Sequence, residues 1–146
     1  MKSKRPSSYP IREMAGIDAI RAQKLRAFQI RTTTRYLEKA KTPRGRKALA
    51  DLMEISASEI LRLANKADLM RIKGIGDDYT ELLFASGVDT VRELRLRKPS
   101  QLAQKMVVAN ETAATKGKKL VRLLPSEKTI QRWIERAKTL PLQISY

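Results

Sequence analysis

The sequence contains no cysteine and no histidine among its 146 residues. Disulfides, zinc sites of the Cys/His type, and Ser-His-Asp or Cys-His nucleophiles are therefore excluded. The commonest general base, a side chain that titrates near pH 7, is missing as well. Aromatic residues number only seven, and no uncharged run approaches the ~18 apolar residues that a membrane span needs.

The first six residues are basic, but no apolar segment follows them. A secretory signal requires such a segment, so we expect none here. The expected location is the cytoplasm, including the nucleoid if the partner is DNA.

Positive charge is what the sequence has in excess. Lysine and arginine number 31 against 15 acidic residues, which gives a net charge of +16. Residues 1–50 carry +11, residues 51–98 carry −1 and residues 99–146 carry +6. Nucleic acid is the usual partner of so basic a chain, with an anionic membrane surface and acidic proteins as alternatives. We expect an electrostatic interface to centre on the first third.

The sequence also repeats itself. Residues 14–25 align with residues 72–83 at an offset of 58, and residues 56–64 align with residues 126–134 at an offset of 70. Two collinear matches favour a duplication in which the second copy carries an extra loop near 109–119. The matched pairs include Gly16 and Gly74, Ile17 and Ile75, Leu25 and Leu83, Ile60 and Ile130, and Leu63 and Trp133.

Helical periodicity runs through both copies, and the alternation typical of strands is absent. Ser56 and Ser126 precede apolar helical stripes and Thr90 precedes another helix, so all three are expected N-caps. Trp133 falls on the last stripe and is expected in the core. Residues 109–119 show no apolar periodicity and predict a loop. The predicted fold is all-α.

These observations predict four segments: a basic disordered arm (1–10), a first unit (11–69), a second unit (70–141) and a tail (142–146). The first and second units are helical, and they form either one compact domain or two small subdomains.

A glycine-containing turn is the sharpest local signal, in the segment Ile72-Lys-Gly-Ile-Gly-Asp-Asp-Tyr-Thr-Glu-Leu-Leu83. Gly74 and Gly76 permit backbone conformations that other residues avoid, and Ile75 can fill the joint between two helices. The N–H groups that begin the second helix then favour an anion. A DNA phosphate fits such a site, and the contact does not depend on base sequence.

This turn resembles the helix-hairpin-helix motif of DNA repair and recombination proteins. Over about residues 10–141, the chain resembles a bacterial family of small tandem helix-hairpin-helix proteins of unknown function. The likeness includes residues 42–50, 65–74 and 123–128. The resemblance implies two tandem helix-hairpin-helix units and no established activity.

The two copies divide the features of a good phosphate site between them. In the second copy, Asp77 and Asp78 follow the glycines and would repel a phosphate. In the first copy, Asp18 replaces the second glycine and Gln29 the loop-closing glycine, but cations are abundant. We therefore expect binding mainly through side chains of the first copy. The candidate nucleic-acid-binding residues are Gly16, Arg21, Lys24, Arg26, Arg31, Arg35, Lys41, Arg44, Arg46, Lys47, Lys73, Gly74, Gly76, Lys118 and Lys119.

Residues 46–63 also resemble a helix-turn-helix, with Glu54 at the position that usually holds glycine. The second helix of this pair begins with Ala57, Ser58 and Glu59, which offer no cation to read bases, and this favours an ordinary helix pair. The basic turn before it is the stronger candidate. There Thr42, Pro43 and Gly45 mark a helix start among Lys39, Lys41, Arg44, Arg46 and Lys47.

Three classes of function can be compared. The first is a non-catalytic protein that binds the backbone of duplex DNA without sequence preference. RNA stays open, and the few aromatics disfavour single-strand binding by stacking. The second is a structural or adaptor protein that docks an acidic protein or a larger assembly, which an exposed apolar patch would favour. The third, an enzyme, is disfavoured, and we expect no cofactor and no metal. The sequence leaves the oligomeric state open.

Overall fold

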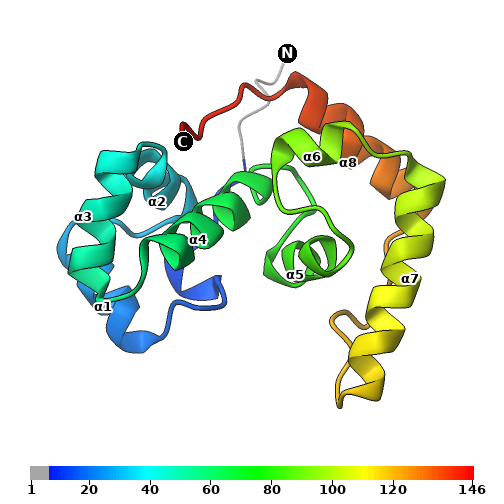
Figure 1. The fold of residues 1–146 in the computed structure, drawn as a ribbon, viewed down its shortest axis with the longest axis horizontal. Helices are drawn as coiled ribbons and strands as arrows, with labels where there is room; N and C mark the ends of the chain where they lie inside the picture. The colour runs from blue at the N-terminus through cyan, green and yellow to red at the C-terminus, as the bar shows by residue number, and fades with distance from the viewer. Residues whose placement is uncertain (1–6) are drawn as a thin grey trace. The chain divides into compact units, whose positions relative to one another are not determined.

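The structure is a computed structural model that describes residues 7–146, and these residues form helices without a strand (Figure 1). The predicted all-α fold is therefore confirmed. Within the described range, one isolated β-type bridge pairs Pro10 with Thr32. Contacts group the chain into unit 1, residues 7–73 with 143–146, and unit 2, residues 74–142. No helix in the described range is both long and apolar enough to cross a membrane.

Unit 1 is built from a short 3-10 turn and four α-helices. Helices α2, α3 and α4 pack against one another, and α1 packs on α3. Their apolar faces bury side chains such as those of Leu25, Leu49, Ile60 and Leu63. The elements are η1 (Ile11–Glu13), α1 (Ala19–Ala27), α2 (Thr33–Ala40), α3 (Pro43–Met53) and α4 (Ala57–Leu69).

Tyr36 is fully buried in this core. Its hydroxyl donates a hydrogen bond to the carbonyl oxygen of Ile60 at 3.0 Å. Burial raises the pKa of the Tyr36 phenol, and the nearby Glu59 carboxylate raises it further. The core therefore holds a neutral phenol that ties α2 to α4.

The segments at the two ends of the chain pack on unit 1. Residues 1–6 of the expected disordered arm lie outside the described residues, but the residues that follow are ordered. Tyr9 donates its N–H to the Thr33 hydroxyl and accepts the Thr33 N–H in return. Residues 7–10, which the prediction includes in that arm, therefore pack on unit 1. In the tail, Ser145 donates its N–H to the carbonyl oxygen of Lys41 at 2.8 Å.

Unit 2 contains four α-helices. Helix α8 packs along α7 and α6, and α5 packs on α7 (Figure 1). Trp133 of α8 is buried as predicted, and its ring centroid lies 5.2 Å from that of Tyr79. The elements are α5 (Asp77–Ala85), α6 (Val91–Arg95), α7 (Pro99–Thr115) and α8 (Glu127–Thr139).

The loop predicted over 109–119 is wrong in its first part, because α7 continues to Thr115. Buried Asn110 connects this helix to the loop that follows. Its Oδ1 accepts the N–H groups of Leu120 and Val121 at 2.8 and 3.1 Å, and its Nδ2 donates to the Val121 carbonyl at 3.1 Å. The last turns of α7 are otherwise mostly exposed, so no apolar stripe marks them as helical.

Helix starts recur along the chain. Helix α5 begins 58 residues after α1, α6 begins 58 residues after α2, and α8 begins 70 residues after α4. The predicted N-caps Ser56, Thr90 and Ser126 each accept a backbone N–H, so these three predictions are confirmed. The backbone turns recur as well, since Gly16 and Gly74 have φ angles of 95° and 92°.

Candidate functional site

The turn before α1 is closed by its own side chains. Asp18 is the N-cap of α1, and its carboxylate accepts the N–H of Arg21 at 2.8 Å. The Arg21 guanidinium donates to the carbonyl oxygen of Gly16 at 3.0 Å. Asp18 thus provides the anion at this helix start, and the Arg21 side chain lies along the turn.

The two glycines of the second turn play different parts. Gly74 has a φ of 92°, and a Cβ atom there would lie 3.2 Å from the indole nitrogen of Trp133. Gly76 has a φ of −94°, an ordinary angle, and a Cβ atom there would meet nothing within 4 Å. The expectation that Gly76, like Gly74, adopts a backbone conformation that other residues avoid is therefore wrong. Asp77 and Asp78 occupy the first turn of α5.

Two of the predicted cations are paired with acidic side chains. Lys24 contacts the Glu54 carboxylate at 2.8 Å, and Lys41 contacts the Glu38 carboxylate at 2.9 Å. The hydrogen bond and the charge of Lys24 lower the pKa of Glu54. Glu54 itself has a φ of 57°, the left-handed conformation usual for glycine at this turn position. Each lysine would have to give up its carboxylate partner, at least in part, before it could bind a phosphate.

Arg46 is buried and holds the tail of the chain. Its guanidinium donates to the carbonyl oxygens of Ala40 at 2.9 Å and Ser145 at 2.7 Å. Its central carbon also lies 5.9 Å from the ring centroid of Tyr146. A guanidinium with these partners is structural, so we leave Arg46 out of the interface.

Helices α1 to α3 and the loop before α2 carry six other cations that are exposed and form no ion pair with any residue of the range 7–146. Arg12, Arg62 and Lys73 are also exposed in unit 1, but they lie outside these elements. Because described carboxylates do not neutralise the six, they concentrate positive potential on unit 1. We call these six the unit 1 cations: Arg26, Arg31, Arg35, Lys39, Arg44 and Lys47.

The start of α3 presents two of these cations. Thr42 is the N-cap and accepts the Gly45 N–H at 3.0 Å, and Pro43 occupies the first turn, as predicted. Arg44 and Lys47 then project into solvent from the first two turns. The remaining predicted cations, Lys73, Lys118 and Lys119, are exposed. The last two lie in the loop after α7.

A groove of about 490 Å³ lies in unit 1 beside these cations. It runs between the end of α1, the outer side of α2 and the middle of α3. Most of its lining is apolar, and Arg35 and Lys39 contribute the cations. We call it the Phe28 groove, lined by Phe28, Gln29, Ile30, Arg35, Glu38, Lys39, Ala48, Leu49 and Leu52.

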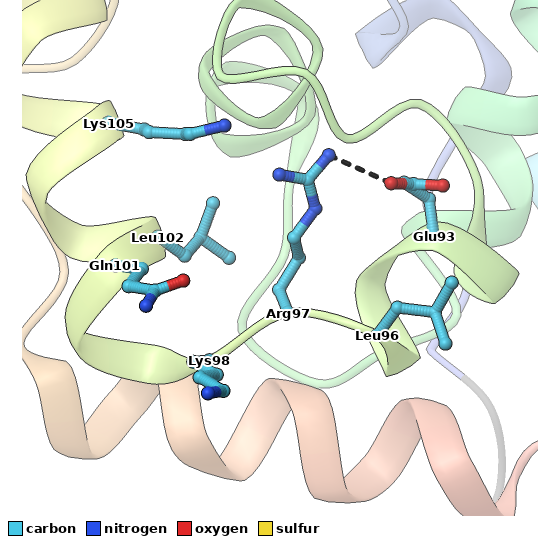
Figure 2. Close-up of a pocket in the computed structure, with 7 residues that line it drawn as sticks. All are labelled: Glu93, Leu96, Arg97, Lys98, Gln101, Leu102 and Lys105. Atoms are coloured by element: carbon cyan, nitrogen blue, oxygen red, sulfur yellow. Dashed lines mark hydrogen bonds and ion pairs between the residues drawn. The ribbon is translucent and has the colours of Figure 1, made fainter.

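A second groove, in unit 2, has polar walls (Figure 2). Arg97 lies in its middle, and its guanidinium donates to Glu93 at 2.8 Å and to the carbonyl oxygen of Gly87 at 2.9 Å. Figure 2 shows Lys105 extending from α7 toward the same opening. The groove is lined by Glu93, Leu96, Arg97, Lys98, Gln101, Leu102 and Lys105.

Sequence reasoning found neither groove. The Phe28 groove is lined from α1, α2 and α3, which meet only in the folded unit, so no local motif encodes it. The lining of the second groove falls within residues 93–105, at the junction of α6 and α7. One signal was available in the repeat, because Phe28 is aromatic where the second copy has Ser86.

Comparison with curated proteins and comparison with solved structures each gave no match. A family model described as a domain of unknown function, DUF4332, matches residues 15–140. This range includes the glycine-containing turns before α1 and α5, the unit 1 cations, the Phe28 groove and the second groove. The chain therefore belongs to the DUF4332 family.

Proposed function

We propose that this protein is a non-catalytic nucleic-acid-binding protein that contacts the sugar–phosphate backbone of duplex DNA. The observation that carries the proposal is the set of unit 1 cations, all exposed and none paired with a described carboxylate. Arginine and lysine side chains of this kind neutralise phosphates and release counterions, which favours binding whatever the base sequence.

The start of α4, the second helix of the pair that resembles a helix-turn-helix, favours backbone contacts over base reading. A recognition helix carries base-reading side chains at its exposed start. Helix α4 begins with Ala57, Ser58 and Glu59, and the Ser56 hydroxyl caps the Glu59 N–H at 3.1 Å. No cation or amide is available there to read a base edge.

The recurrence of helix starts and turn conformations supports two tandem helix-hairpin-helix units. In this scheme, unit 1 supplies the main contacts. Asp18 already caps α1 in unit 1, so long cationic side chains contact phosphates in place of the helix N–H groups. In unit 2, Asp77 and Asp78 place negative charge at the start of α5 and oppose a phosphate there.

A salt titration tests the proposal. Binding to a labelled duplex of about 30 base pairs would be followed by fluorescence anisotropy as the salt concentration is raised. With about six neutralised phosphates, affinity should fall about a thousandfold between roughly 50 and 200 mM salt. Failure to bind at the lower salt concentration would overturn the proposal.

Charge reversal locates the interface. The triple variant Arg26→Glu, Arg31→Glu and Arg35→Glu should weaken duplex binding about a hundredfold or more. A matched control reverses three exposed cations of α8 in unit 2, namely Lys128→Glu, Arg132→Glu and Lys138→Glu. Both variants change the net charge equally. Equal losses in the two would show that net charge alone drives binding, and would contradict an interface on unit 1.

A further inference from the structure

Phe28 is a large aromatic side chain left in solvent. It is 64% exposed at the end of α1. Its counterpart 58 residues later, Ser86, is only 5% exposed, and its hydroxyl donates to the Leu82 carbonyl at 2.7 Å. The C-cap of α5 in unit 2 is thus a small polar residue at the position where α1 has Phe28. Ending the helix therefore does not require a phenyl ring.

The Phe28 groove combines an apolar wall with a basic rim. Phe28, Leu49 and Leu52 contribute the wall, while Arg35 and Lys39 stand one helical turn apart on α2. The one acidic residue of the lining, Glu38, contacts Lys41 at 2.9 Å, so its charge is already compensated. The groove therefore favours a ligand with a flat or apolar part beside a negative charge.

The corresponding region of unit 2 has a different lining. Helices α3 and α7 both begin with proline, at Pro43 and Pro99, and this sets an offset of 56 between them. At this offset Gln104 corresponds to Ala48 and Lys105 to Leu49. Gln104 and Lys105 line a third groove, also in unit 2, together with Ser86 and Gly87. Of these two grooves, only that of unit 1 combines an aromatic ring with cations, so the ring is a feature of this copy.

We propose that the Phe28 groove binds an unpaired nucleobase, so that DNA with a single-stranded overhang binds more tightly than blunt duplex. An aromatic face stacks on any base, and cations beside it hold the phosphate of the same nucleotide. The Gln29 amide at the rim can donate to and accept from a base edge. A base inside a duplex is stacked on its neighbours and cannot enter, so the ligand is an unpaired end or strand.

The position of the cations favours a nucleotide over an acidic peptide. Arg35 and Lys39 belong to the unit 1 cations, which are proposed to hold the phosphate backbone. A strand held there brings its own bases to Phe28 without a second partner. This inference rests on the proposed function, and it names the form of DNA that the same surface prefers.

The test compares two DNA ligands with the same number of phosphates, a blunt duplex and a duplex with a short thymine overhang. Stacking of one base on an aromatic ring should tighten binding to the overhang about fivefold to a hundredfold in anisotropy titrations. Phe28→Ala should remove this preference and leave affinity for blunt duplex unchanged within about twofold. Phe28→Trp should retain the preference, because indole also stacks.

Ile20→Ala is the matched control. Ile20 lies on the same helix, is 67% exposed and does not line the groove. Its loss removes a similar exposed apolar surface, so the overhang preference should persist. A 2-aminopurine at the first unpaired position gives a second readout. Its fluorescence should change on binding to the wild-type protein and not on binding to Phe28→Ala.

The outcomes separate the two proposals. No binding to either DNA overturns the proposed function and this inference together. Equal binding of blunt and overhanging DNA, or a preference that survives Phe28→Ala, overturns only the inference. One further arm uses a synthetic acidic helical peptide with leucines on one face. Binding of that peptide that depends on Phe28, without an overhang preference, would make the groove a protein-docking site and the inference wrong.

Discussion

A Cβ atom on Gly45 would lie 1.8 Å from the carbonyl oxygen of Lys39. The backbone at the end of α2 therefore lies directly against the first turn of α3, and the turn between the two helices is very short. The same turn exposes Arg44 and Lys47. Close packing of two backbones, rather than an unusual φ angle, therefore requires glycine at this position.

Gly45→Ala should lower the free energy of unfolding by about 3 kcal/mol or more, because backbone atoms would have to move apart. Urea denaturation followed by circular dichroism measures the loss. Gly76→Ala is the control, since a Cβ there meets nothing, and its effect should stay within about 1 kcal/mol. Similar losses in the two variants would contradict the assigned contact.

Arg44 and Arg46 should separate binding from stability. Arg46→Ala removes hydrogen bonds to Ala40 and Ser145 and leaves buried groups unsatisfied, so it should cost about 2 kcal/mol or more of stability. Arg44→Ala should change stability by about 0.5 kcal/mol or less and weaken duplex binding. Denaturation and anisotropy on both variants provide the comparison. A stable Arg46→Ala protein with weakened DNA binding would reverse the assignment.

Tyr36 should make stability depend on alkaline pH. Because its pKa is raised above the ordinary value of 10.0 in the folded protein, its contribution is present below pH 10 and is lost as the pH rises further. Tyr36→Phe also loses the hydrogen bond to Ile60, at a cost of about 1 kcal/mol near neutral pH. The difference in unfolding free energy between wild type and Tyr36→Phe should therefore shrink above pH 10. A constant difference would indicate that Tyr36 ionises normally.

Asn110 should stabilise the loop after α7. Asn110→Ala removes three hydrogen bonds to backbone groups of Leu120 and Val121 and should cost about 2–4 kcal/mol. Hydrogen exchange should show faster exchange of the Leu120 and Val121 amides. The exposed neighbour offers the control, because Glu111→Ala should change stability by no more than about 0.5 kcal/mol. Unchanged exchange at Leu120 would contradict the role of the amide.

Local signals predicted the local features of this chain. Ser56, Thr90 and Ser126 were recognised as N-caps, because a capping side chain acts on an N–H only a few residues away. The spacing of apolar residues placed Trp133 in the core for a similar reason, since one helical stripe must face inward. The end of α7 was missed, because its last turns are mostly exposed and carry no apolar stripe.

The sequence alone determined the all-α class, the helix starts and the excess of positive charge, since each depends on composition or on neighbours within a few residues. The tertiary structure decided which cations are available. It paired Lys24 with Glu54, buried Arg46 beneath the tail and left the unit 1 cations exposed. It also brought Phe28 beside Arg35 and Lys39 in one groove. These relationships join residues from separate helices, and such contacts exist only once the helices pack.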